Sequence, residues 1–134
     1  MRVRRTGVTI PNDVLERLDN LIQKLGLKSR SKVITEAVQS YIAEREALLY
    51  QDSPVIGIVA FTYLHTRGDT MKKLVHVQHH HLDSILFNTH VHLTEDRCLE
   101  VVMFKGKASE LKDLVKEVEN IPGVELVKFL CFKV

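Results

Sequence analysis

Hydrophobic positions in the first fifty residues or so outline one strand and two helices. Residues 3–10 predict a short strand, which ends at Pro11 because proline cannot donate to a ladder. From Asn12, a good N-cap, apolar residues recur at helical spacing, and Gly26 is expected to end this helix. A second amphipathic helix is predicted to open near Ser29. The order is therefore strand, helix, helix.

This first unit has apolar stripes but few partners of its own to cover them, and a segment of about fifty residues is hard to stabilise alone. We therefore expect a homodimer in which two copies share one core and their strands pair as an antiparallel ribbon. Segment 47–54 breaks the helical pattern and ends at Pro54. We divide the chain into a first domain of residues 1–48, a linker of residues 49–54 and a second domain of residues 55–134.

The second domain shows the order βαββαβ, which is typical of a ferredoxin-like sandwich with two helices on one face of an antiparallel sheet. The predicted fold class is α+β. The other sheet face needs a cover, which favours a second contact between copies. The predicted strands are 55–64, 85–93, 98–105 and 124–132, and the predicted helices are 69–81 and 108–120.

Composition narrows the class of protein. With 45% hydrophobic and 27% charged residues, the chain of 134 residues is typical of a globular protein rather than a disordered or fibrous one. No apolar stretch approaches the ~18 residues of a membrane span, and none follows the first arginines as a signal peptide would. We expect a cytoplasmic protein without a membrane partner. In that reducing compartment Cys98 and Cys131 are expected to be buried or metal-bound rather than paired.

Charge and histidine are unevenly distributed. The net charge is only +2, but Arg2, Arg4 and Arg5 all precede the first acidic residue, Asp13. Six of the seven histidines fall in the segment 76–92. Two regions with different chemistry follow, a basic N-terminus and a histidine-rich second domain.

His90 and His92 are separated by one residue of a predicted strand, so both side chains leave the same face. Cys98 begins the returning strand, and it shares that face if it lies opposite His92. This register requires a five-residue loop or a bulge in the hairpin. Given that register, one hairpin supplies three metal ligands, and the sequence predicts a metal site here.

A fourth ligand is expected from the histidine run that starts at His79. Consecutive helical positions point about 100° apart, so only one member of the run faces the ion. The spacing does not choose among His79, His80 and His81, and His76 competes because it lies one turn before His79. His65 lies near a loop and is expected to be exposed.

Three histidines and a cysteine are chemically ambiguous. A tetrahedral arrangement would suit zinc, whereas a planar one would suit Ni(II) or Cu(II). Four protein ligands leave no open position for a reacting water, which argues against an enzyme.

The stretch QHHHLDSILFNTHVHLTEDRCLEVVMFKG, behind an RSK-containing strand-helix-helix unit, resembles the NikR-type nickel-responsive transcription regulators. The resemblance implies an N-terminal ribbon-helix-helix domain and a C-terminal ACT-like domain in a dimer-of-dimers homotetramer. It implies one nickel ion, Ni(2+), per subunit in a square-planar site made by His90, His92 and Cys98 of one subunit and His79 of another. By the same matching, Glu100 would orient a ligand, and its alternative is an ordinary solvated strand residue.

A two-stranded ribbon fits the major groove of double-stranded DNA. If Val8 and Ile10 point into the dimer core, then Arg5, Gly7 and Thr9 point outward. Arg5 can pair with guanine in bidentate fashion and Thr9 can contact a base or phosphate, whereas Gly7 has no side chain with which to recognise a base.

The start of the second helix, at Ser29, Arg30 and Ser31, resembles the family's phosphate-contacting turn. The alternative for Ser29 is simple helix capping, and the two roles are compatible. Lys32 stands where the family commonly has an acid, so a second cation site is not carried over.

We expect a nickel-responsive transcriptional regulator, a repressor of nickel-uptake genes that binds a palindromic operator. Metal binding would fasten the helix that bears His79 to a neighbouring hairpin, so that both N-terminal dimers meet the DNA together. The alternatives are a DNA-binding regulator that senses another metal or a small molecule, and a metal storage or transfer protein. These alternatives predict different responses of DNA binding to nickel.

Overall fold

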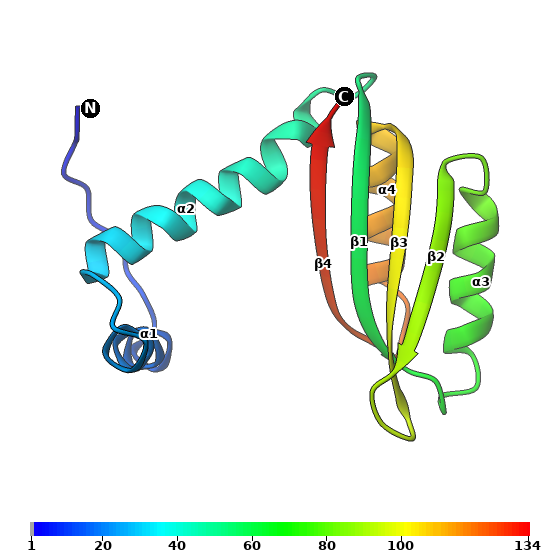
Figure 1. Cartoon of the computed structure of the whole chain (residues 1–134), viewed down its shortest axis with the longest axis horizontal. Helices are drawn as coiled ribbons and strands as arrows, with labels where there is room; N and C mark the ends of the chain where they lie inside the picture. Colours follow the sequence, from blue (N-terminus) through cyan, green and yellow to red (C-terminus); the bar gives the residue numbers. More distant parts are fainter. Residues whose placement is uncertain (1) are drawn as a thin grey trace. The chain divides into compact units, whose positions relative to one another are not determined.

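The computed structural model describes residues 2–134, which divide into two compact units between Tyr41 and Ile42 (Figure 1). The first unit holds helix α1 (Asn12–Leu25) and most of helix α2 (Arg30–Glu46). The carbonyl of Pro11 accepts the first helical hydrogen bond, from the Leu15 N–H at 3.0 Å. Asn12 is therefore the first residue of α1, and its predicted role as the N-cap is wrong.

The turn between the two helices follows the predicted caps. Gly26 adopts the left-handed conformation, with φ of 63°, and its N–H donates to the carbonyl of Ile22. The Ser29 hydroxyl accepts a hydrogen bond from the Lys32 N–H at 3.1 Å, which satisfies one of the free amide groups at the start of α2. Both capping predictions are confirmed.

Residues 3–10 do not form the predicted strand within one chain. The sheet found in residues 2–134 has four strands, and residues 3–10 belong to none of them. The physical reason is that a strand needs a neighbour to accept and donate its ladder hydrogen bonds. The neighbour we predicted is the same segment of a second copy.

The first unit has no core of its own. Neither α1 nor α2 contains a buried residue. Large apolar side chains of both helices are exposed to between 46% and 65%, which is costly for an isolated domain. This exposure fits the expectation that two copies share one core. The exposed apolar residues of the two helices are Val14, Leu21, Leu25, Val38, Tyr41 and Ile42.

The second unit has the predicted βαββαβ order and confirms the α+β fold class. A short 3-10 helix η1 (Ala47–Leu49) precedes its first strand. Its sheet is antiparallel throughout, in the order β2-β3-β1-β4 (Figure 1). The elements are β1 (Pro54–Leu64), α3 (Thr70–His80), β2 (Ile85–His92), β3 (Arg97–Lys107), α4 (Ala108–Glu119) and β4 (Val124–Lys133).

The core of the second unit lies between the sheet and the helices. Alternate residues of β1 and β3 are buried on the helix-covered face, and α4 contributes five buried side chains. Gly57 lies under α4, where an added Cβ would stand 2.7 Å from a methyl carbon of Leu111. A larger residue at this position would therefore require Leu111 to move, and glycine allows the close approach of α4 to β1 without that shift.

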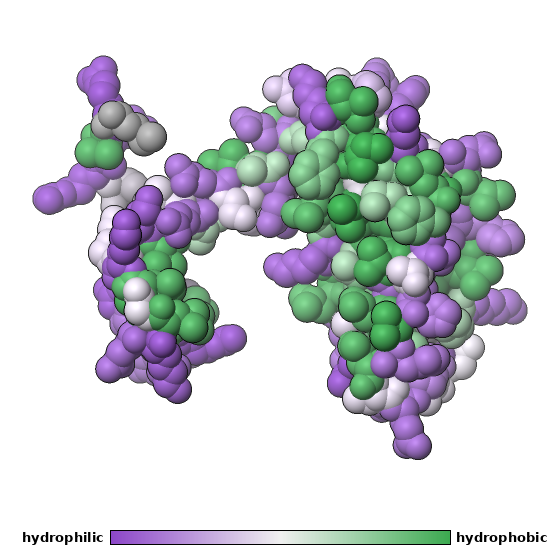
Figure 2. Space-filling model, viewed as in Figure 1, coloured by the Kyte–Doolittle hydropathy of each residue, from purple (hydrophilic) through white to green (hydrophobic). Residues whose placement is uncertain are grey.

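The opposite face of the sheet is apolar and open. Phe87 and Val91 of β2 and Leu126, Leu130 and Phe132 of β4 are exposed to about half of their surface. Figure 2 shows hydrophobic residues gathered over the strands on the side away from α4. An apolar face of this kind fits the predicted contact with another copy. In the part of the chain that the structure describes, no helix combines the length and the apolar character that a membrane crossing needs.

Candidate functional site

The hairpin of β2 and β3 places the predicted ligands in the expected register. His92 lies opposite Cys98, and His90 lies opposite Glu100. The Leu93 N–H donates to the Arg97 carbonyl at 2.8 Å and closes the turn. Because directly opposite residues share a face, these four side chains leave the same side of the sheet. The register that we predicted from the spacing is confirmed.

These side chains differ in exposure because of their strands. Cys98 and Glu100, on the inner strand β3, are buried, with 1% and 5% of their surface exposed. His90 and His92 stand on the edge strand β2 and are exposed. The site therefore combines an enclosed sulfur with imidazoles that open outward from the edge of the sheet.

The distances fit a shared ion. Cys98 Sγ lies 3.2 Å from His92 Nδ1. With bonds of about 2.3 Å to sulfur and about 2.0 Å to nitrogen, two ligands of one ion lie about 3.0 Å apart at a right angle and about 3.5 Å apart at the tetrahedral angle. The observed distance lies between these values. The ring of His90 is perpendicular to that of His92, with centroids 5.7 Å apart.

His65 also belongs to this region, and our expectation that it is exposed is wrong. It is half-buried, and its Nε2 atom is buried with no hydrogen-bond partner among the described residues. Its ligand atom and those of His92 and Cys98 lie within 4.8 Å of one another. The sequence did carry a signal, because His65 follows Tyr63 by two residues and so has the parity of the buried face of β1.

His79 lies on α3, two residues after Val77, and is exposed. Within residues 2–134 it takes part in neither of the clusters of side chains that could hold a metal ion. Its role as a ligand donated to another subunit stays a prediction.

Glu100 forms the centre of a polar network that sequence reasoning missed. Its carboxylate accepts hydrogen bonds from the side-chain amides of Gln78 and Asn88, the second at 3.3 Å. Asn88 also donates to the amide oxygen of Gln78 at 2.8 Å. The network joins β3 and β2 to α3 at the residue directly before His79. Glu100 is therefore not the solvated strand residue of the alternative interpretation.

Tyr63 of β1 lies directly opposite Cys98 of β3, on the same buried face. Burial, followed by the neighbouring Glu100 and Cys98 groups, raises the pKa of Tyr63 to about 12. The phenol is therefore neutral at physiological pH and able to donate a hydrogen bond to the acidic groups beside it.

The predicted DNA-contacting residues are exposed. Arg5, Gly7 and Thr9 precede α1, and a side chain at Gly7 would meet nothing within 4 Å. Ser29 and Ser31 are exposed at the start of α2.

Arg30 and Lys32 each have an acidic partner. The Arg30 guanidinium binds Asp19 of α1 in bidentate fashion, at 3.1 and 2.7 Å, and this hydrogen bonding lowers the pKa of Asp19. The Lys32 ammonium lies 3.6 Å from Glu36, one turn later on the same helix.

Comparisons with known proteins agree for both units. A family model described as the NikR C terminal nickel binding domain matches residues 56–132, and one described as a ribbon-helix-helix protein of the copG family matches residues 4–45. A curated relative from Thermococcus onnurineus, assigned as a nickel-responsive regulator, is 34% identical over 93% of this chain and 90% of its own length. A similarly assigned relative from Methanosarcina mazei is 36% identical, over 92% and 89%.

Solved structures are similar in fold alone. An uncharacterized protein from Thermotoga maritima superposes with a TM-score of 0.55 and 17% identity, over 60% of this chain and 99% of that chain. The ACT domain of a GTP pyrophosphokinase from Chlorobium tepidum gives a TM-score of 0.51 and 12% identity, over 58% and 100%. These likenesses confirm the ACT-like architecture predicted for the second domain.

Proposed function

The chain belongs to the NikR family of nickel-responsive regulators, and from this premise we propose how its residues perform that function. It is a nickel-responsive transcriptional regulator with a DNA-binding ribbon-helix-helix domain and a nickel-binding C-terminal domain. We assign residues 1–48 to the DNA-binding domain, residues 49–54 to a linker, and residues 55–134 to the metal-binding and tetramerisation domain.

His90, His92 and Cys98 of one subunit and His79 of another are the proposed nickel ligands. The observation that carries this proposal is the pairing of His92 with Cys98 across the hairpin, at 3.2 Å. A thiolate and three imidazoles are ligands that suit a planar Ni(II) ion, whose four bonds would join the two subunits. Since all four positions are filled by protein, we propose binding without metal-water catalysis.

Glu100 positions His79, the ligand that its own subunit would donate to a neighbouring subunit. Its carboxylate accepts hydrogen bonds from Gln78, which directly precedes His79, and from Asn88, which lies two residues before His90. A carboxylate at this place fixes the end of α3 relative to the hairpin of the same subunit. Each subunit would thus present both halves of the shared site at a set spacing.

DNA recognition is proposed for the ribbon formed by residues 3–10 of two copies. Arg5 would recognise guanine and Thr9 would contact a base or phosphate, while Gly7 lets the backbone approach the groove. Ser29, Arg30 and Ser31 would meet a phosphate at the start of α2.

The proposed assembly is a dimer of dimers. The open apolar face of the sheet supports an association between second domains, and the coreless first unit supports pairing of the first domains. When His79 is tied to another subunit's hairpin, arrangements in which both ribbons reach one palindromic operator gain population, and binding by both raises the affinity. The proposed outcome is repression of nickel-uptake genes.

The test measures DNA binding with and without Ni(II). A randomised pool of double-stranded DNA is enriched on the wild-type protein with Ni(II), and the affinity for the selected duplex is then measured with Ni(II) and with chelator. We expect tight binding only with Ni(II). His90→Ala should bind the duplex weakly in both conditions and should bind Ni(II) at least tenfold more weakly.

His65→Ala is the matched control, since it removes a histidine beside the same sulfur that lies outside the proposed ligand set. It should keep the nickel response. If His65→Ala abolishes Ni(II) binding while His90→Ala keeps it, the ion sits on His65, His92 and Cys98 within one chain, and the ligand assignment is wrong. Equal affinity for the duplex with Ni(II) and with chelator would refute the switch.

A further inference from the structure

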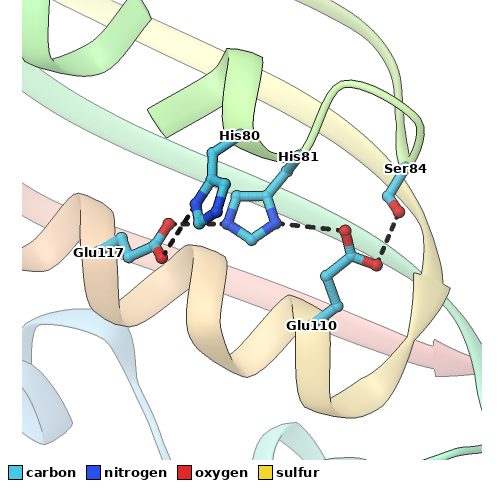
Figure 3. Close-up of polar contacts among 5 residues, drawn as sticks. All are labelled: His80, His81, Ser84, Glu110 and Glu117. Atoms are coloured by element: carbon cyan, nitrogen blue, oxygen red, sulfur yellow. Dashed lines mark hydrogen bonds and ion pairs between the residues drawn. The ribbon is translucent and has the colours of Figure 1, made fainter. Parts of the chain in front are cut away.

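A second cluster of metal-ligating side chains lies between the end of α3 and the last turn of α4, and we propose that it is a second divalent metal site. The cluster consists of His80, His81 and Glu117 (Figure 3). None of these residues belongs to the hairpin ligand set. The proposed second site and the proposed nickel site can therefore be tested independently.

The three side chains converge on one point. His81 Nε2 lies 2.7 Å from Glu117 Oε2, and His80 Nδ1 lies 3.6 Å from Glu117 Oε1. One nitrogen from each ring and one carboxylate oxygen all lie within 4.8 Å of one another. Ligand atoms of a tetrahedral ion lie about 3.3 Å apart for bonds of about 2.0 Å, so only small rotations are needed.

The rest of the His81 environment is built as that of a metal ligand. His81 is buried, with 6% of its surface exposed. Its other ring nitrogen, Nδ1, lies 3.2 Å from Glu110 Oε1, and the Ser84 hydroxyl donates to the second oxygen of Glu110 at 2.7 Å. Figure 3 shows this line from Ser84 through Glu110 to the ring. A carboxylate on the second nitrogen orients a ligating imidazole and strengthens it as a donor.

The charges also suit a cation. The Glu117 carboxylate lies beside ring nitrogens of two neighbouring histidines. A divalent ion bound to all three side chains would offset the carboxylate charge and accept both nitrogen lone pairs.

The ion has access from solvent. His80 is 71% exposed, and together with Glu117 it lines a groove of about 790 Å³ between α3 and α4. Two nitrogens and one carboxylate oxygen suit a first-row ion such as Zn(II), whereas Mg(II) and Ca(II) prefer oxygen ligands throughout. Three protein ligands leave the fourth position for water. An ion held here would tie the last turn of α3, which bears His79, to α4.

The experiment uses Co(II) as a spectroscopic substitute for zinc, on the full-length protein under argon. A Co(II)–thiolate bond gives a strong charge-transfer absorption, so the hairpin site, which contains Cys98, is distinguished from the proposed site, which has no sulfur. In the wild type we expect two ions per subunit. The charge-transfer band should saturate with one ion, while the weaker visible bands continue to grow with the second.

Glu117→Gln keeps the shape of the side chain and its hydrogen bond to His81, so the protein should fold. Both Glu117→Gln and His80→Ala should weaken the second ion at least tenfold and leave the charge-transfer band unchanged. Glu119→Gln, which removes an exposed charge from the same helix, is the matched control and should still bind two ions.

Three outcomes would overturn the proposal. In the first, the wild type would bind only one ion per subunit. In the second, Glu117→Gln would bind the second ion as tightly as the wild type does. In the third, His76→Ala would remove the second ion while Glu117→Gln keeps it, which would place the ion on the exposed pair of His76 and His80, one turn apart on α3. None of these outcomes affects the hairpin assignment, which is monitored separately by the charge-transfer band.

Discussion

Replacing Glu100 by glutamine removes a buried negative charge without changing the length of the side chain. The carboxylate accepts hydrogen bonds from the amide nitrogens of Gln78 and Asn88, and it lies beside Tyr63. Glutamine has one oxygen and one amide nitrogen at the same place. Both amides donate to the same carboxylate oxygen, Oε2, so the amide oxygen of glutamine can still accept both hydrogen bonds, but as a neutral rather than a charged acceptor.

The magnitude follows from this loss of charge. A hydrogen bond to a charged group contributes about 1.5–3 kcal/mol and one between neutral groups about 0.5–1.5 kcal/mol, so Glu100→Gln should lower the free energy of unfolding of the metal-free protein by about 1–3 kcal/mol. Loss of an outer partner of a metal site typically weakens metal affinity about 10- to 100-fold, or about 1.4–2.8 kcal/mol. We expect the affinity for Ni(II) to fall within this range.

Unfolding by urea, followed by circular dichroism, gives the first quantity, and competition for Ni(II) with a chelator of known affinity gives the second. The control is Glu95→Gln, which removes the same charge from the exposed turn between β2 and β3. If Glu100→Gln lowers stability but binds Ni(II) as the wild type does, then Glu100 only fastens α3 to the sheet. If neither quantity changes, the network has no energetic role and the reasoning is wrong.

Three further predictions concern other parts of the chain. Because burial beside acidic groups raises the pKa of Tyr63 to about 12, the contribution of the neutral phenol to stability should be complete below about pH 10 and be lost as the pH rises toward 12. In urea unfolding across this pH range, the free energy of unfolding of Tyr63→Phe should fall less than that of the wild type. Gly123→Ala should lower the free energy of unfolding by about 1–3 kcal/mol, since φ is 96° and the new Cβ would lie 2.2 Å from the Thr70 hydroxyl oxygen. Gly68→Ala, whose new Cβ would meet nothing within 4 Å, should leave the free energy of unfolding measured with urea unchanged. Arg5→Ala should weaken binding to the selected duplex by about 1–3 kcal/mol and relax its base preference, as measured by fluorescence anisotropy against variant duplexes; an unchanged preference would contradict base recognition by this residue.

The hairpin could be predicted from the sequence because its information is local. One residue between His90 and His92 places both on one face, and five residues between His92 and Cys98 allow only a few turns. The caps at Gly26 and Ser29 were predictable for the same reason. Each depends on residues within one turn of the chain.

The network around Glu100 could not be predicted because it depends on how α3 is rotated against the sheet. Gln78 is followed by three histidines, and periodicity alone does not say which of these positions faces β3. The half-buried position of His65 depends in turn on how far β1 extends beyond its apolar run. The backbone N–H of His65 donates to the Asp96 carbonyl at 3.0 Å, so the backbone hydrogen bonds between β1 and the β2–β3 hairpin continue past Leu64.

The strand predicted for residues 3–10 illustrates a third limit of prediction from one sequence, since the partner of this strand belongs to a second copy.

Arg30, at the start of α2, forms an ion pair with Asp19 of α1. Exposed ion pairs contribute little to stability, so the main effect of Asp19 is to orient the guanidinium at the start of α2. Asp19 engages Nε and one terminal nitrogen of Arg30, and the guanidinium has further N–H groups on its other terminal nitrogen. Arg30 can therefore bind a phosphate without releasing Asp19, and the pair prepares the predicted contact with DNA rather than competing with it.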